Sequence, residues 1–228
     1  MITNRQLLLP YALPYLAYVG IASIPSDFLA LHVNYLCRLI VVPLLLIWAW
    51  RWYCPLTGPR SLAGSIATGA AAGLAGLALW LALLAPFVQP DEVKPWTLTE
   101  FLLRLCSAGL VVPLFEELMM RGFVFRLAFQ WDKARRTGQP DPLHVALDHH
   151  SVNEVEPGRW SWAAVILSTL AFTSGHVMAE WPAAVAYGLL MAWLAIRRQD
   201  LVACISAHAV TNIALALFVY ATDSWHFW

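Results

Sequence analysis

The chain has 228 residues, of which 60% are hydrophobic and only 12% are charged, and its mean hydropathy is +0.63. Soluble domains carry about 25% charged residues, so this composition excludes an ordinary soluble protein and indicates one integral membrane domain over residues 1–228. The 14 basic and 14 acidic residues cancel, and no overall positive field favours nucleic acid as a partner. Membrane lipids are therefore the first partners that the sequence predicts.

The N-terminus and the cysteines give no sign of a leader peptide or a cysteine metal site. Arg5 is the only basic residue before an apolar stretch that Pro10 and Pro14 interrupt, and no small-residue cleavage site follows. We therefore interpret this stretch as the first membrane helix. The cysteines show no CxxC spacing and are interpreted as small core residues: Cys37, Cys54, Cys106 and Cys204.

A membrane-spanning helix needs about 17–25 mostly apolar residues. By this measure we predict an all-α fold, with about seven (six to eight) transmembrane helices in one bundle around a buried polar site. The sixth segment is short enough to be a partial or tilted span, and the fourth is long enough to project from the membrane. In chain order the segments are about 7–25, 29–52, 63–89, 98–127, 160–180, 182–197 and 200–221.

Two local patterns mark the third and fourth segments. Gly69 and Gly73 give the third segment a small-xxx-small face, on which another helix can pack closely. Thr97 and Glu100 have the Thr-x-x-Glu spacing of a capping box, so a helix should begin there. From about residue 97 to residue 221 the chain carries all the motifs discussed below.

The arginine and lysine residues are concentrated in alternate loops between the predicted membrane segments. If the N-terminus is cytoplasmic, ten arginines and lysines lie on that side, whereas only Lys94 lies outside. This asymmetry predicts an odd number of spans, with a cytoplasmic N-terminus and an external C-terminus. The long polar loop at about 132–158 is then cytoplasmic, and we interpret its His149-His150 pair as part of a solvated surface rather than a metal site.

The stretch LFEELMMRGF places three charges in the fourth apolar segment: Glu116, Glu117 and Arg121. Each ionised side chain at a helix centre costs about 2.5–3.5 kcal/mol on insertion scales, so such residues face protein or a water-filled cavity. Glu117 and Arg121 are four residues apart with the acid first, which favours an ion pair. That pair either supports a site or only locks helix packing. Glu116 points about 100° away without that partner, and is the candidate general base.

Two further apolar segments contain complementary groups. The stretch AFTSGH places Phe172 four residues before His176, and SAHAVTN places His208 four residues before Asn212. Each histidine alone could be a packing residue. A base, two imidazoles and an amide donor together suit the attack of water on a carbonyl, with the His and Asn groups facing the developing oxyanion.

Helix lengths give a rough check on depth. Glu116 and His208 each lie about ten residues from their predicted cytoplasmic helix ends, so they fall at similar depth. His176 lies about sixteen residues from the start of its segment, nearer the outer face. A break at Gly175, a deeper start or a tilt of the fifth segment would reconcile the three.

At these stretches the chain resembles the CPBP intramembrane protease family, which includes the type II CAAX prenyl endopeptidases and their bacterial relatives. The resemblance covers about residues 99–217. It consists of three motifs in the family's order: Glu-Glu-x-x-x-Arg at Glu116, Glu117 and Arg121, Phe-x-x-x-His at Phe172 and His176, and His-x-x-x-Asn at His208 and Asn212.

The resemblance implies a membrane-embedded endopeptidase, in a bacterial inner membrane, that acts on a membrane-anchored or lipidated peptide or protein. In the family's glutamate-protease scheme, Glu116 would activate water with the help of His176. His208 and Asn212 would stabilise the oxyanion, and the supporting residues would be Glu117, Arg121 and Phe172. We favour this route without a cofactor. The alternative is a zinc ion held by Glu116, His176 and His208, although the chain lacks a His-Glu-x-x-His motif.

Two other functions remain open at this point. A proton-coupled transporter would use Glu and His as a relay, although no repeat of broken helices is evident. A non-catalytic membrane scaffold or immunity protein would keep the site as a relic. Arg38 and Arg104 also lie in apolar runs, where they either snorkel to the interface or bind a substrate carboxylate.

Overall fold

The computed structural model describes residues 2–89 and 95–227, and every structural statement below refers to that part of the chain. The described chain is all-helical and has no strand. The helices are α1 (Asn4–Ala22), α2 (Leu31–Ala49), α3 (Leu62–Leu84), α4 (Leu98–Cys106), α5 (Val112–Glu117), α6 (Phe125–Arg136), α7 (Pro142–Asp148), α8 (Trp162–Ser174), α9 (Trp181–Arg198) and α10 (Leu201–Thr222).

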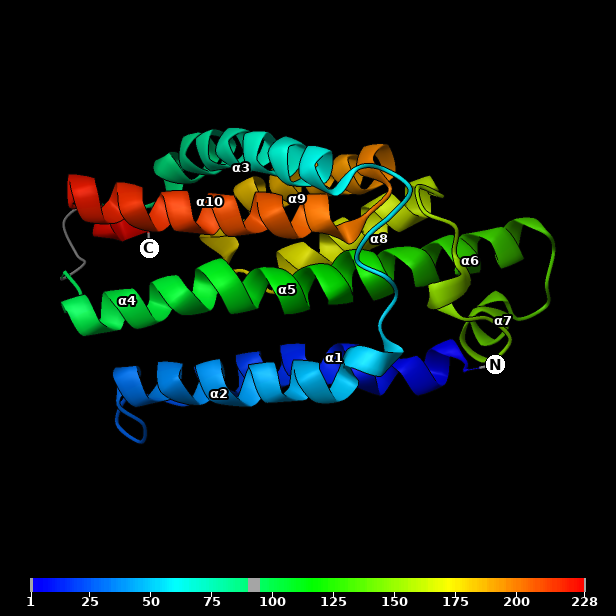
Figure 1. The fold of residues 1–228 in the computed structure, drawn as a ribbon, viewed down its shortest axis with the longest axis horizontal. Helices are drawn as coiled ribbons and strands as arrows, with labels where there is room; N and C mark the ends of the chain where they lie inside the picture. The colour runs from blue at the N-terminus through cyan, green and yellow to red at the C-terminus, as the bar shows by residue number, and fades with distance from the viewer. Residues whose placement is uncertain (1, 90–94, 228) are drawn as a thin grey trace.

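One long rod organises the fold. Helices α4, α5 and α6, with the two π-helical segments that join them, form one continuous helix of 39 residues over Leu98–Arg136. At 1.5 Å per residue the rod is about 58 Å long. The α1–α2 pair lies on one side of it, and α3, α8, α9 and α10 lie on the other (Figure 1). The predicted end at residue 127 is therefore wrong, and residues 132–136 are helix rather than loop.

The beginning of the rod is capped as predicted. The backbone N–H of Glu100 donates to Thr97 Oγ1 at 3.3 Å, and the backbone N–H of Thr97 donates to Glu100 Oε2 at 3.2 Å. This capping box satisfies N–H groups that the first helical turn would otherwise leave without acceptors.

Several helices are long and apolar enough to cross a membrane. Five meet that measure: Leu31–Trp52, Leu62–Phe87, Leu98–Arg136, Met178–Arg198 and Leu201–Thr222. Helix α1 has 19 residues and two internal prolines, and α8 has only 13 residues, about 20 Å against a hydrocarbon core of about 30 Å. The predicted segment 160–180 is thus not one spanning helix. It ends at Ser174 with Gly175 as the C-cap, and a break at Gly175 is one of the three alternatives that would reconcile the depth of His176.

Helices α3 and α10 pack at very short range through the predicted small-residue face. A Cβ atom built on Gly69 would lie 2.5 Å from the carbonyl oxygen of Ala203, and one on Gly73 would lie 2.5 Å from that of Ala207. Thr211 Oγ1 adds a hydrogen bond to the Gly73 carbonyl at 2.8 Å. Only glycine allows this approach, which fixes the position of the α10 segment that carries His208.

The polar segment after the rod is folded against the N-terminus. The buried side chain of Asn4 donates to Gln130 Oε1 at 2.6 Å and to the Ala146 carbonyl at 2.8 Å, and its Oδ1 accepts from the backbone N–H of Val152 at 2.5 Å. His149 and His150 are exposed, in agreement with a solvated surface.

Candidate active site

The two glutamates lie on an irregular part of the rod. Helix α5 has only six residues and ends at Glu117, between the π-helical segments Ser107–Val111 and Leu118–Val124. Each π-helical turn widens the helix and rotates the side chains that follow it, and such turns are frequent at functional sites. A regular 3.6-residue period could not reveal this local geometry.

Glu117 is the centre of a fully buried polar cluster. Its Oε1 accepts from Arg121 Nη1 at 3.2 Å and contacts His208 Nδ1 at 2.9 Å, and the side chains of Glu117 and Arg121 have no exposed surface. Arg121 Nη2 also donates to the Gly188 carbonyl at 3.3 Å. The predicted Glu117–Arg121 pair therefore forms, and it joins the rod to both α9 and α10.

Glu116 points to a different environment. Its side chain is 16% exposed, and its Oε2 lies 3.9 Å from His208 Nε2. That separation is too long for a hydrogen bond. The two nitrogens of the His208 ring thus face the two adjacent glutamates, Nδ1 toward the buried one and Nε2 toward the accessible one. The sequence did not predict the contact of His208 with Glu117, because the motif spacing related His208 only to Asn212.

His176 follows the end of α8 and lies beside Phe172. Its Nδ1 is 3.0 Å from the Phe172 carbonyl oxygen; because a carbonyl only accepts, Nδ1 carries the hydrogen and Nε2 is left available. The Phe172 ring centroid is 4.6 Å from that of His176 and 6.1 Å from that of His208. The guanidinium carbon of Arg121 lies 5.2 Å from the centroid of the same ring. The Phe172 ring is therefore a common neighbour of Arg121, His176 and His208.

Asn212 connects α10 to the first π-helical segment of the rod. Its Nδ2 donates to the Ala108 carbonyl at 2.7 Å. This bond uses one of the two amide hydrogens and fixes the orientation of the group, so the second hydrogen remains for another acceptor.

A cavity of about 300 Å³ brings these residues together. It is lined by Glu116, Phe172, His176, His208 and Asn212, whereas Glu117 and Arg121 lie behind its wall. The structure therefore gathers residues from the rod, α8 and α10 at one place, as the three motifs predict.

Sequence reasoning missed several residues of the same wall. Tyr187 donates from its hydroxyl to Thr211 Oγ1 at 3.0 Å, and its ring centroid lies 5.8 Å from that of His208. The Trp80 ring centroid lies 5.4 Å from that of His176. None of these belongs to a motif with charged residues, and an apolar segment gives no signal that separates them from packing aromatics.

Zinc is the alternative that the sequence left open, with Glu116, His176 and His208 as its ligands. Within residues 2–89 and 95–227, no group of three His, Cys, Asp or Glu side chains is arranged to hold a metal ion. The alternative ligands Glu116, His176 and His208 share the cavity wall but do not converge on one point, so no step below depends on a metal.

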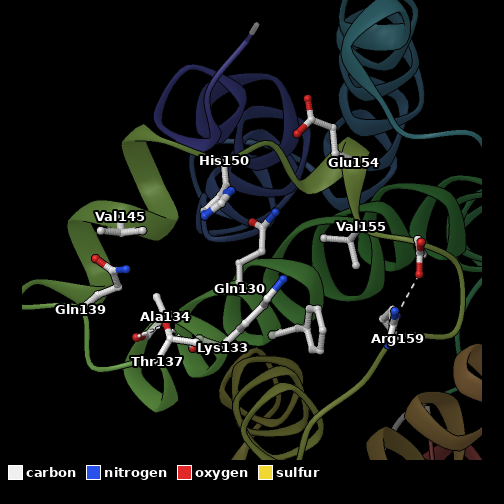
Figure 2. A pocket seen from close by; sticks show the side chains of 12 residues that line it. Gln130, Lys133, Ala134, Thr137, Gln139, Val145, His150, Glu154, Val155 and Arg159 are labelled. Carbon is white, nitrogen blue, oxygen red and sulfur yellow. Dashed lines mark hydrogen bonds and ion pairs between the residues drawn. The ribbon is translucent and has the colours of Figure 1, made fainter.

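A larger cavity lies elsewhere in the described part of the chain. It measures about 570 Å³ and lies between α6, α7 and the segment 150–159, with Lys133, His150 and Arg159 among its lining residues (Figure 2). No motif residue lines it. Size alone would therefore favour a different end of the bundle from the one where the motif residues lie.

The fold and the cavity define an all-helical integral membrane protein with a carboxylate, two imidazoles and an amide around one pocket. Over residues 98–214 the sequence matches the family described as type II CAAX prenyl endopeptidase Rce1-like. The match covers just over half of the 228 residues and includes all three motifs, so the chain belongs to this family. Membership indicates CAAX-type intramembrane protease activity and favours it over a transporter or a scaffold. Neither a curated protein nor a solved structure matches the chain.

Proposed function

We propose that the chain is an intramembrane endopeptidase in which Glu116 activates the water that hydrolyses a peptide bond. The observation that carries this proposal is the difference between the two adjacent acids. Glu117 is sealed and paired, whereas Glu116 is partly exposed on the cavity wall and accepts no hydrogen bond from any described residue. A general base needs this accessibility, because it must reach the proton that it removes.

The charges of the cluster balance in the reactive state. Glu116 and Glu117 contribute two negative charges, and Arg121 with a protonated His208 contributes two positive ones. With Glu117 accepting at Nδ1, protonated His208 directs a second N–H from Nε2 toward the cavity. A balanced set avoids an uncompensated charge inside the protein, which is strongly destabilising.

The chemistry then follows in two steps. Glu116 takes a proton from water as the water oxygen bonds to the carbonyl carbon, and the carbonyl oxygen becomes an oxyanion. His208 Nε2–H and the free amide hydrogen of Asn212 stabilise that oxyanion. Glu116 next returns the proton to the leaving nitrogen as the carbon–nitrogen bond breaks. His176, with Nε2 available, accepts a hydrogen bond from the attacking water and orients it.

The arrangement in the membrane follows from the charged loops. We propose about seven crossings in a bacterial inner membrane, counting α1 and, as one broken crossing, α8 with residues 175–180. The N-terminus and the α7 region are then in the cytoplasm and the C-terminus is outside. Asp91, Glu92 and Lys94, which enter this assignment, lie outside the described residues. Lipids surround the bundle, and the substrate is a membrane-anchored or lipidated peptide or protein rather than a nucleic acid. No cofactor is required.

The test is cleavage of a farnesylated CAAX peptide and of a panel of unprenylated peptides by the protein in proteoliposomes, with products identified by mass spectrometry. Loss of a general base lowers rates by about 10²–10⁴-fold, so Glu116→Gln should lose at least a hundredfold of its activity. Glu156→Gln is the matched control, because Glu156 has an exposed side chain and does not line the cavity. A wild-type protein that leaves every peptide intact, or a Glu116→Gln variant within tenfold of wild type, contradicts the proposal.

A further inference from the structure

The catalytic cavity extends along the rod from Glu116 in one direction. Every fourth residue of the rod lines it, and the last of them on the side of α6 is Glu116: Arg104, Ala108, Val112 and Glu116. Arg104 and Arg126 are 22 residues apart on this continuous helix, which is about 33 Å along its axis. That length is close to the thickness of a hydrocarbon core, about 30 Å, so the two residues mark its two boundaries in the proposed topology. The cavity wall therefore reaches the outer boundary at Arg104.

The other helices line the cavity on the same side of the motif residues. Helix α10 contributes residues from His208 to Leu215, in the direction of its outer end, and Phe227 beyond that end also lines the cavity. The remaining helices line it only in their outer halves, with Tyr18 on α1, Trp80 on α3, His176 just after α8 and Glu180 just before α9. Within the described chain, the residues that follow these positions toward the cytoplasm do not line the cavity.

Packed side chains close the cytoplasmic side of the site. The side chains of Glu117 and Arg121 have no exposed surface, and Leu118 and Phe123 on the same rod are each 1% exposed. A small cavity of about 30 Å³ lies on the cytoplasmic side, next to Arg126; Arg121 lines this small cavity but not the catalytic one. A peptide that came from the cytoplasm would have to displace the buried ion pair.

The outer part of the cavity is polar. Arg104 and Glu180 line it, whereas the exposed groove between α2 and the rod is lined by apolar residues such as Leu46, Ile47 and Leu114. Charged side chains are costly in hydrocarbon and face protein or water-filled cavities. The outer end of the cavity therefore has the lining of an opening to water, and not that of a groove filled by lipid.

We infer that the peptide segment to be cleaved reaches Glu116 from the external side of the membrane. The substrates are then membrane-anchored proteins whose cleaved segment lies outside the cytoplasm. The end of the bundle with α4 and the C-terminus carries the opening, and the end with α6, α7 and the N-terminus carries most of the basic residues that indicate the cytoplasm (Figure 1). The inference rests on the proposed function and topology, because it assigns a direction of entry to the same cavity.

Thiol labelling measures the direction of access without requiring catalysis. Ala108→Cys and Val112→Cys each place a thiol on the cavity wall between Glu116 and the outer end. Each is made in a protein whose native cysteines are replaced by alanine: Cys37, Cys54, Cys106 and Cys204. The reagent is the cation trimethylammonioethyl methanethiosulfonate. Because an ionic reagent crosses hydrocarbon poorly, both thiols should react at least about tenfold faster in spheroplasts, which expose the external side, than in inside-out vesicles.

Two exposed positions control for the sidedness of the membranes. Arg135→Cys, at a side chain 57% exposed on α6, should react only in inside-out vesicles, and Phe28→Cys, at a residue 85% exposed between α1 and α2, only in spheroplasts. The inference is overturned if these controls exchange sides, because the topology is then reversed. It is also overturned if the cavity thiols react as fast or faster from the cytoplasmic side, or if neither reacts in either preparation.

A cleavage assay in cells separates this inference from the proposed function. A peptide that the protein cuts in proteoliposomes is fused to a single membrane-spanning helix, at the external end in one reporter and at the cytoplasmic end in another. Only the external reporter should be cut. Cutting of the cytoplasmic reporter would overturn the direction of entry and leave the role of Glu116 standing. External labelling of a protein that cuts no peptide would overturn the proposed function and leave the direction of access standing.

Discussion

Replacing Glu117 by glutamine removes the carboxylate charge at the point where the rod contacts α9 and α10. Glu117 Oε1 accepts from Arg121 and contacts His208 Nδ1, and both pair members on the rod are fully buried. The glutamine has nearly the same shape, so packing is preserved. Arg121 would be left as a buried cation with the Gly188 carbonyl and the Phe172 ring as its remaining partners.

The expected loss follows from that uncompensated charge. Breaking a buried ion pair by removing one partner costs about 3–5 kcal/mol, which is about two to four powers of ten in the ratio of folded to unfolded protein. Replacing the pair as a whole by apolar residues is often nearly neutral. The double variant Glu117→Gln, Arg121→Met should therefore recover at least half of the stability that the single variant loses.

Equilibrium unfolding in mixed micelles of dodecylmaltoside and dodecyl sulfate, followed by tryptophan fluorescence, measures both effects. Glu156→Gln is the control, because its ion pair with Arg159 at 2.9 Å has side chains 72% and 63% exposed and should contribute at most about 1 kcal/mol. A Glu117→Gln protein within about 1 kcal/mol of wild type would refute the reasoning. So would a double variant no more stable than the single one.

Three further predictions concern the packing and the N-terminal region. Gly73→Ala should lower stability by about 1–3 kcal/mol and reduce peptide cleavage, because its Cβ meets the Ala207 carbonyl, whereas Gly20→Ala, with open space around it, should not. Asn4→Ala should cost about 1–3 kcal/mol and speed hydrogen exchange in 146–152, since three buried hydrogen bonds are lost. The Arg5 guanidinium lowers the pKa of Asp148, so this contact stabilises the fold above about pH 4 and is lost as pH falls through the lowered value; unfolding scans against pH should show that loss in wild type and not in Asp148→Asn.

Much of this arrangement could be predicted because the chemistry is concentrated in a few charged residues. Charges are so costly in an apolar segment that Glu116, Glu117 and Arg121 had to face protein, and the four-residue spacing fixed the Glu117–Arg121 pair. The spacing of Gly69 and Gly73 likewise predicted a face on which another helix can pack closely, although only the structure identifies α10 as that helix. In each case the argument needed only a regular helix and its spacing.

The remaining features depend on contacts between distant segments. The π-helical turns around α5 have no composition of their own, and the bond of Asn212 to the Ala108 carbonyl holds one of them against α10. The early end of α8 at Ser174 could be suspected only from the depth of His176. The stacking of Arg38 and Arg104 on aromatic rings from other segments has no periodic signature either.

The length of the rod has a consequence for the water that the reaction uses. Arg126, on the cytoplasmic side of the proposed topology, follows Glu116 by ten residues, which is about 15 Å of helix. That distance is about half the thickness of a bilayer's hydrocarbon core. In the proposed topology the scissile bond therefore meets its nucleophile near the midplane of the bilayer, and water must reach the cavity across about half of the hydrocarbon core. The cavity at Glu116 must therefore admit water as well as the peptide in each turnover.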